Sequence, residues 1–411
     1  MSTQNIQPFQ LSDSTRARFD REVAKYPADQ KQSAVMACLS ILQQEQGHVS
    51  AEGELAVAEY LGTKASVDGP PPAAFCKDRS VKLSANARGW NGWSPDASNA
   101  RFQSSDLAGL SLDKVRNLKL KWAFGFDGDV TAFSPPTVIG NQVFVGSGSG
   151  LIHAMHADTG CLQWVFQANG PVRSSILLAE KTLLFGDMTG WFYGVAAETG
   201  KLIWKVQVET HDSTRLTGGP AVHDGVVYVP VASWEETRAL NPEYQCCTFR
   251  GSVTALKVSD GSQVWKTYMI PPPKQTGKNS AGTPIFGPSG AGIWSTPTLD
   301  AKRNRLYVTT GDNYSAPATM TSDAITALDI PTGKVLWSRQ TYPGDAWNSS
   351  CADGKRINCQ SDDAPDYDFG SSAILAHTNT GRDLVISGQK SGVVYAVDPD
   401  KNGEKIGRAH V

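Results

Sequence analysis

One short pattern recurs along this chain and constrains the fold more than any other feature. A turn centred on Gly follows a strand-like run, and a Trp stands four residues after that Gly. The four copies carry Gly160 and Trp164, Gly200 and Trp204, Gly261 and Trp265, and Gly333 and Trp337. A fifth copy reaches Gly403 but has no Trp. Self-similarity at a period of roughly 40 residues or more is typical of β-propeller blades.

The segments around each Gly predict short strands. Residues 137–139, 143–145, 227–229 and 306–308 are β-branched and aromatic runs bounded by turn residues. The repeat therefore predicts an all-β propeller in which the recurring Trp packs between neighbouring blades. Because four copies and part of a fifth are present, we expect about four to five blades, C-terminally truncated within the ring.

Composition and charge exclude several classes of function. The formal net charge is −2 over 411 residues, so no global field attracts nucleic acid. No apolar run is long enough to span a bilayer, and residues 1–11 contain no signal-peptide core. We therefore expect no nucleic-acid partner and no membrane span. The 39 Gly and 11 Trp residues fit a turn-rich β protein.

The seven cysteines favour disulfides over a metal or haem site. Neither a Cys-x-x-Cys-His haem motif nor a zinc spacing is present. Three pairings are candidates: Cys351 with Cys359, the adjacent Cys246 with Cys247, and Cys76 with Cys161. The first pair flanks a short polar loop, which predicts a disulfide. The second is either a vicinal disulfide, which suits an oxidising compartment, or two reduced buried thiols.

Four segments of unlike character divide the chain. They are an α-helical segment at 1–62, a Gly/Pro/Ala-rich linker at 63–88, a partial propeller at 89–405 and a tail at 406–411. The tail, Ile-Gly-Arg-Ala-His-Val, stands where the fifth repeat should lead to its Trp. We interpret it as an artefactual tail that truncates the repeat. The alternative is a natural gene with a degenerate end.

The helical segment has a resemblance of its own. The stretch from Phe19 to Leu61, which begins FDREVAKYPADQ, resembles the N-terminal helices of an iron–sulfur component of bacterial NADH-quinone oxidoreductase. That family continues into a thioredoxin-like domain with a [2Fe–2S] cluster, whose cysteines are absent here. The iron–sulfur function is therefore not carried over. We interpret the chain as a chimera in which this fragment precedes a second gene.

Residues 76 to 405 resemble the quinoprotein alcohol dehydrogenases, which depend on pyrroloquinoline quinone (PQQ). Among these, they resemble the polyvinyl alcohol dehydrogenases most closely. The resemblance is carried by stretches such as WNGWSPDASNARFQ, NPEYQCCTFRGSVTAL, GPSGAGIWSTPTLD and SGQKSGVVYAVDPD. It implies an eight-bladed propeller that binds PQQ and usually Ca²⁺, and a periplasmic parent enzyme. It also implies hydride transfer from secondary or polymeric alcohols to PQQ, with a c-type cytochrome as electron acceptor. We expect this truncated chain to be inactive by itself.

PQQ is a flat, anionic ortho-quinone, so its site needs an aromatic floor, cationic donors and a Lewis acid. By the resemblance, Trp294 is that floor, and Lys390 donates to the quinone oxygens. Thr217 is similar to a hydrogen-bonding Thr of the family, and Arg173 is a weaker candidate for a PQQ carboxylate. The Cys246-Cys247 pair is a candidate to cover the cofactor. The alternative for the Trp is an ordinary core residue.

Oxygen ligands are what a hard cation such as Ca²⁺ prefers. Glu235 matches the family's metal-binding Glu, and Glu236 is the fallback. Thr310-Gly311-Asp312-Asn313 stands where better-known members have Thr-Gly-Asn, so Asp312 or Asn313 is the expected second ligand. The alternative for exposed loop carboxylates is simple solvation.

A general base must accept the alcohol proton while hydride leaves. Asp366-Tyr367-Asp368 falls where related enzymes carry their catalytic Asp, and the pair Asp366 and Asp368 is assigned without a choice between them. The alternative is a turn with two solvated acids.

Two other functions compete with the enzyme hypothesis. A non-catalytic propeller, like the scaffold lipoproteins of outer-membrane assembly, would have similar repeats without metal and floor residues. A role in respiratory complex I is suggested only by the first 60 or so residues. The joint presence of Glu235, Trp294, Lys390 and the Asp366/Asp368 pair favours the enzyme.

Overall fold

Antiparallel strands that follow one another along the chain dominate the structure. A computed structural model describes residues 10–46, 51–62, 75–83, 89–126, 129, 131–361 and 365–410, and the statements below concern these residues. They fall into two compact units, each described by itself. One holds Met1–Ala74, Lys119–Ala132 and Thr159–Cys161, and the other holds Phe75–Leu118, Phe133–Asp158 and Leu162–Val411.

Helices make up most of the first unit. They are α1 (Asp13–Val23), the 3₁₀ helix η1 (Ala28–Ala34), α2 (Val35–Gln46) and α3 (Ala51–Leu61). Ser12 begins α1, because its hydroxyl accepts a hydrogen bond from the Thr15 N–H at 3.1 Å. Phe19, Leu42 and Leu61 lie in one buried cluster, so the apolar stripes of the three helices share a core.

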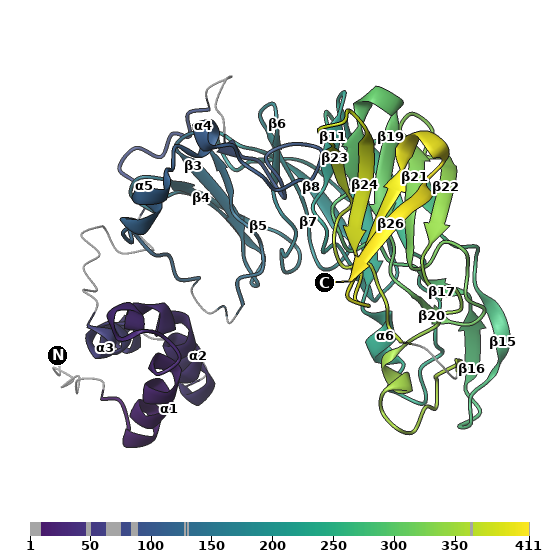
Figure 1. Ribbon diagram of the computed structural model, residues 1–411, viewed down its shortest axis with the longest axis horizontal. Coiled ribbons are helices and arrows are strands. Elements are labelled where there is room, and N and C mark those ends of the chain that lie inside the picture. The colour runs from purple at the N-terminus through teal and green to yellow at the C-terminus, as the bar shows by residue number, and fades with distance from the viewer. Residues whose placement is uncertain are drawn as a thin grey trace. The chain divides into compact units, whose positions relative to one another are not determined.

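Five up-and-down sheets of four or five strands form the body of the second unit, among the residues described (Figure 1). The first joins β1 (Gly89–Trp90), β2 (Thr137–Ile139), β3 (Gln142–Gly146), β4 (Leu151–His156) and β5 (Leu162–Gln167). The second joins β6 (Leu177–Ala179), β7 (Thr182–Gly186), β8 (Trp191–Ala196) and β9 (Leu202–Gln207). The third joins β10 (Thr214–Arg215), β11 (Ala221–His223), β12 (Val226–Ser233), β13 (Ser252–Lys257) and β14 (Gln263–Tyr268).

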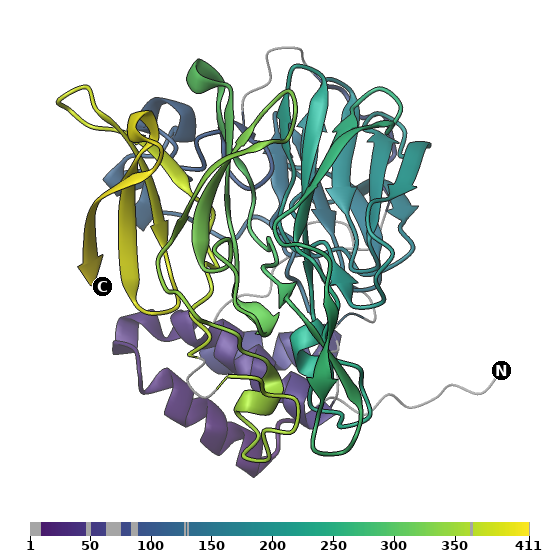
Figure 2. The same cartoon turned by 90° about the vertical axis from the view of Figure 1, so that its right-hand side faces the viewer.

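The last two sheets continue the same order. The fourth is β18 (Thr298–Asp300), β19 (Arg305–Thr309), β21 (Ala324–Asp329) and β22 (Val335–Gln340). The fifth is β23 (Ile374–His377), β24 (Asp383–Gly388), β25 (Val393–Asp398) and β26 (Glu404–His410). Figure 2 shows these sheets standing beside one another. The fold is therefore mostly β, while the eight-bladed ring remains a prediction.

Loops within and between the sheets form small elements of their own. They are α4 (Ser105–Ala108), α5 (Leu112–Arg116), α6 (Glu235–Arg238), the pairs β15 (Lys274–Lys278) with β16 (Pro284–Gly287) and β17 (Ser289–Gly290) with β20 (Asn313–Ser315), and the 3₁₀ turns η2 (Ala301–Arg303), η3 (Ser349–Cys351) and η4 (Pro399–Lys401). No helix in the described part of the chain is long and apolar enough to cross a membrane.

The recurring Trp packs against the turn of the next repeat, as the pattern predicts. An added Cβ at Gly200 would stand 2.6 Å from Trp164, and one at Gly261 would stand 2.6 Å from Trp204. The Trp204 indole N–H also donates to the Val258 carbonyl at 2.8 Å. Because these Gly residues have φ near +70° and no side chain, the indole can lie directly on the turn. The prediction of inter-blade packing is confirmed.

The segments expected as linker and tail both contain described residues. Val81, expected in a linker, is buried in the same apolar cluster as Phe144 and Trp164, so residues 75–83 belong to the propeller unit. Residues 63–74 and 84–88 of that linker lie outside the described residues. Residues 406–410 of the expected tail are the end of β26, which pairs with β25. Main-chain groups make the ladder, so this strand forms without the missing Trp.

The structure contains the predicted Cys351–Cys359 disulfide, with an S–S distance of 2.07 Å. Cys246 and Cys247 are also joined, so the vicinal disulfide is favoured over two thiols. Cys76 and Cys161 are each disulfide-bonded. Cys38 is a free, buried thiol of the helical unit.

Candidate cofactor and metal site

A cavity of about 250 Å³ opens where loops from successive sheets meet. Its walls come from segments that follow β10, β12, β19 and β24 or precede β18 and β23, so residues far apart in sequence converge there. The polar and aromatic lining residues include Arg173, Thr217, Trp234, Glu236, Trp294, Asp312, Tyr314, Trp347, Asp366, Asp368 and Lys390. Most of the predicted site residues are among them.

Three carboxylates meet in this lining. One oxygen from each of Asp312, Asp366 and Asp368 lies within 4.8 Å of the others. Asp368 is held in place, because its Oδ1 accepts a hydrogen bond from the Asp312 N–H at 2.7 Å. The Lys390 Nζ lies 2.6 Å from Asp366 Oδ1 and 2.6 Å from Asp368 Oδ2, so its single ammonium group forms ion pairs with both carboxylates.

Charge and burial shift the titration of this cluster. Burial raises the pKa of Asp312 well above its usual range, and the charge of Asp368 raises it further. Burial also raises the pKa of Asp366, to about 6, although Lys390 opposes the shift. Asp312 Oδ2 is buried and has no hydrogen-bond partner among the described residues. A buried carboxylate oxygen without a donor is costly, and a bound cation removes that cost.

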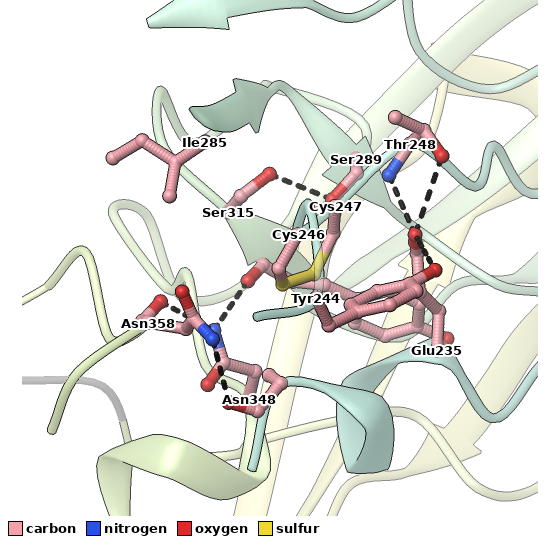
Figure 3. Close-up of a disulfide and its surroundings, with 12 residues drawn as sticks. Glu235, Tyr244, Cys246, Cys247, Thr248, Ile285, Ser289, Ser315, Asn348 and Asn358 are labelled. Atoms are coloured by element: carbon pink, nitrogen blue, oxygen red, sulfur yellow. Dashed lines mark hydrogen bonds between the residues drawn. A yellow bond between two sulfur atoms is a disulfide. The ribbon is translucent and has the colours of Figure 1, made fainter. Parts of the chain in front are cut away.

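The structure brings Glu236, not Glu235, to the cavity. Glu235 is fully buried, and its two oxygens accept hydrogen bonds from the main-chain N–H groups of Thr248 and Phe249. Figure 3 shows the bond from Thr248. Glu236 lines the cavity, and its Oε2 is buried without a partner in the described part of the chain. Burial raises the pKa of Glu236 to about 7. The fallback residue of the sequence prediction is therefore the one that lines the cavity.

Asn313 is likewise turned away from the cavity. Its Oδ1 accepts from the Thr319 N–H at 2.7 Å, and its Nδ2 donates to the Ser289 carbonyl at 2.9 Å. Asp312 and Tyr314 line the cavity instead, because alternate residues of an extended chain face the same side. Of the two expected ligands in this turn, the structure places Asp312 with the other acids.

Trp294 presents a half-buried indole to the cavity. The Lys390 Nζ lies 5.6 Å from its ring centroid, and the Thr217 hydroxyl donates to its carbonyl at 3.4 Å. Gly370 lets the main chain approach the indole, since an added Cβ would stand 2.8 Å from the ring. Arg173 also lines the cavity, with its guanidinium 5.2 Å from the Phe133 ring.

The Cys246–Cys247 disulfide does not reach the cavity. Both residues are fully buried in an apolar cluster with Val231 and Phe249, and neither is among the lining residues. Their main chain is also tied to Phe286, whose N–H donates to the Cys246 carbonyl at 2.8 Å. The expectation that this pair covers the cofactor is not supported by its position.

Sequence reasoning missed several residues around the site. Trp234, Tyr314 and Trp347 line the cavity, and Asp345 is bound to the loop of the catalytic candidates, because its Oδ2 accepts from the Tyr367 N–H at 3.0 Å. Because alternate residues of an extended chain face the same side, the spacing of Asp312 and Tyr314 could have predicted that both line the cavity. Trp234 lies in the loop between β12 and β13, and Trp347 lies between the fourth and fifth sheets, where no pattern fixes the direction of a side chain.

The residues present fit a hard cation and an anionic, planar ligand. Carboxylate oxygens without donors, on Asp312 and Glu236, are suitable ligands for a cation such as Ca²⁺. Trp294 offers an aromatic face, while Lys390 and Arg173 supply positive charge. The described chain therefore provides what PQQ and a metal ion require.

Known proteins share both the sequence and the repeats that build this cavity. Residues 90–354 match the PQQ family described as the β-propeller domain of glucose/ethanol/alcohol dehydrogenases. The chain is 38% identical over 355 residues to a polyvinylalcohol dehydrogenase of Pseudomonas sp., and 37% identical over 355 residues to one of Sphingopyxis sp. strain 113P3. These alignments cover 82% and 83% of this chain and 54% of each relative, so it spans about half their length.

A solved structure shows the same fold. The quinohemoprotein alcohol dehydrogenase of Comamonas testosteroni superposes with a TM-score of 0.61 at 22% sequence identity, covering 79% of this chain and 49% of that one. The family match extends over more than half of the present chain, and it covers four of the five sheets. The chain therefore belongs to the PQQ-dependent glucose/ethanol/alcohol dehydrogenase family, by its β-propeller domain.

Proposed function

We propose that the cavity binds PQQ together with a hard cation and serves the oxidation of alcohols. The observation that carries this proposal is the meeting of Trp294, Lys390 and the Asp312/Asp366/Asp368 cluster in one cavity. Structural ion pairs do not need an aromatic wall or an unpartnered acid, whereas a redox cofactor with a Lewis acid needs both. The activity is proposed for the polypeptide of which this chain spans about half.

Glu236, Asp312 and Asp368 are the proposed cation ligands. They combine two buried oxygens that lack donors in the described chain with one carboxylate fixed by the main chain. The expected ion is Ca²⁺, because all the ligands are oxygen atoms. With the cation bound, the acids would no longer depend on the charge of Lys390 alone.

PQQ would lie on the indole of Trp294. Lys390 and Arg173 would pair with its carboxylates and carbonyls, and Thr217 would add a hydroxyl donor. When bound, PQQ supplies a two-electron acceptor polarised by the neighbouring cation. Partial burial of Trp294, Asp366 and Asp368 lowers the local dielectric constant, which strengthens charge interactions at this face.

Asp366 is the proposed general base. Its side chain lines the cavity and accepts from Lys390, whereas Asp368 accepts from both Lys390 and the Asp312 N–H. A base must reach the substrate hydroxyl, and the less constrained acid suits that role. Asp366 would accept the hydroxyl proton, and Lys390 would stabilise the resulting arrangement of charges.

Secondary alcohols, including polymeric ones, are the proposed substrates. This rests on the 38% identity to an enzyme named polyvinylalcohol dehydrogenase. Electron transfer to a c-type cytochrome is proposed because reduced PQQ must be reoxidised, and the similar enzyme of Comamonas testosteroni is named a quinohemoprotein. A periplasmic site of action is proposed because the chain contains disulfides.

Calorimetric titration with PQQ in Ca²⁺ buffer tests the proposal. We expect saturable binding that is lost in EDTA, and about tenfold weaker binding in Trp294→Leu because stacking on the indole is lost. Trp191→Leu is the matched control, since Trp191 is also half-buried beside a Lys, with Lys205 Nζ 5.0 Å from its ring. Absence of binding by the wild type, or equal loss in both variants, would favour a non-catalytic scaffold.

A further inference from the structure

Glu235 is a buried acid that the proposed mechanism does not use. Its side chain is fully buried, and its oxygens are surrounded by donors. Oε1 accepts from the Thr248 N–H at 2.7 Å, the Thr248 hydroxyl at 3.3 Å and the Tyr244 hydroxyl at 2.9 Å (Figure 3). Oε2 accepts from the Phe249 N–H at 2.8 Å, and the His211 Nε2 lies 3.4 Å from Oε1. A buried carboxylate with this many donors is well compensated and fixed in direction.

Apart from His211, the groups that contact these oxygens come from one loop, residues 244–249. This loop contains the Cys246–Cys247 disulfide and is tied to β16 by the hydrogen bond from the Phe286 N–H to the Cys246 carbonyl. Its apolar side chains belong to the core beside β12. The loop is therefore held in place by β16 and by the core, and Glu235 links α6 to it through hydrogen bonds.

Helix α6 needs such an anchor, because it has only four residues. Helices this short are not stable by themselves, and the N-cap residue Trp234 makes no side-chain capping bond. Successive residues of a helix point about 100° apart, so fixing one side chain fixes the direction of the next. With Glu235 held by the loop, Glu236 faces the cavity.

We propose that Glu235 is a positioning residue that orients α6 so that Glu236 can bind the cation. The inference rests on the proposed function, because it needs the cation site. Glu235 touches neither the cavity nor the ion. It acts through the main chain of α6, and its loss leaves the helix held at its C-terminal end, where the Asn358 Nδ2 donates to the Ala239 carbonyl at 2.9 Å.

Terbium luminescence provides a readout that does not depend on activity. Tb³⁺ takes the oxygen ligands of Ca²⁺, and the Trp residues that line the cavity sensitise its emission. We expect Glu235→Gln to raise the Tb³⁺ dissociation constant about tenfold or more, as loss of residues behind metal ligands generally does. Gln keeps one carbonyl oxygen but presents an N–H₂ group to the donors on the other side, so the anchor is weakened while the volume is kept. Glu236→Gln should weaken Tb³⁺ at least as much.

Asp187 supplies a matched control. It is fully buried and accepts from the Tyr193 hydroxyl at 2.7 Å and the Gly170 N–H at 3.1 Å, in the second sheet. Asp187→Asn should lower the unfolding temperature, as Glu235→Gln does, and leave the Tb³⁺ constant unchanged. A general effect of destabilisation is thereby separated from an effect on Glu236.

The outcomes distinguish the inference from the function on which it rests. If Glu236→Gln weakens Tb³⁺ and Glu235→Gln does not, the positioning role is wrong and the cation site stands. If neither the wild type nor any variant binds Tb³⁺, the cation site itself is wrong. Should Glu235→Gln fail to fold, Tyr244→Phe combined with Thr248→Val decides, because it removes only hydroxyl donors. An unchanged constant there would overturn the inference, and a several-fold rise would support it.

Discussion

At the scale of single residues, the site contains more carboxylates than its neighbouring positive side chains can balance. Asp312, Asp366 and Asp368 lie together, and Lys390 is shared between the last two. Burial lowers the pKa of Lys390, but the charges of Asp368 and Asp366 outweigh it and hold the pKa above its ordinary value. Asp312 has no such partner at its Oδ2 among the described residues. The cluster is therefore arranged to gain stability from an added cation.

Removing Lys390 tests this balance. Lys390→Met should lower the free energy of unfolding in EDTA by about 1–2 kcal/mol, because two half-buried carboxylates lose a charged hydrogen-bond donor. Adding Ca²⁺ should recover most of that loss. Urea unfolding measures both values, with Lys205→Met as the control at an exposed Lys beside Trp191. Equal losses with and without Ca²⁺ would show that the cation does not share the role of Lys390.

Asp323 predicts a pH dependence of stability. Burial and then the charge of Asp345 raise its pKa to about 9, and neither of its side-chain oxygens has a hydrogen-bond partner among the described residues. The folded pKa is above the ordinary value of 3.8, so the stability that this acid contributes is present below about pH 4 and lost as pH rises toward 9.

Asp323→Asn, which cannot ionise, should therefore be more stable than the wild type at pH 8 in EDTA, by about 1 kcal/mol or more. The difference should shrink as pH falls toward about 4. Thermal unfolding across this range measures it. Parallel curves for the two proteins would show that Asp323 is not held neutral.

At the scale of elements, the Trp and Gly of successive repeats make the contact between sheets. The indole of one repeat lies on the turn of the next, with its N–H on a nearby carbonyl. This contact requires Gly in the turn for two reasons. Its φ is positive, and a side chain there would enter the ring.

Gly261→Ala separates these two costs. An added Cβ would stand 2.6 Å from Trp204, and φ is +72°. We expect a loss of about 2–5 kcal/mol, from about 1–2 for the left-handed conformation and about 1–3 for overpacking. Gly225→Ala, with φ +73° and no atom within 4 Å, should lose only the first part. Urea unfolding compares them, and equal losses would show that the indole contact adds nothing.

Local elements were easier to predict from the sequence than side-chain directions. The repeat reflects the pairing of neighbouring strands, so the sheets and the Trp contacts could be predicted from it. The choice between Glu235 and Glu236 did not, because a one-residue shift in a helix turns the side chain by about 100°. The same applies to Asp312 and Asn313, where a one-residue shift reverses the face. The other residues identified by resemblance lie at the cavity, except for the Cys246–Cys247 pair.

At the scale of the whole molecule, the structure consists of two units whose sequences have different character. The helical unit has its own core around Phe19 and Leu42, and the other unit contains the cavity. Each sheet is specified locally, but the number of sheets in a closed ring is not fixed by any one repeat. Eight blades therefore remain a prediction from resemblance, and the origin of residues 406–411 remains an interpretation of the broken fifth repeat.

Crystals of this chain grown with PQQ and Ca²⁺ would locate the cofactor and the ion in one experiment. We expect PQQ stacked on the Trp294 indole, with the ion bound by Glu236, Asp312 and Asp368. Density for PQQ elsewhere, or a Ca²⁺ ion bound without these carboxylates, would overturn the proposed site.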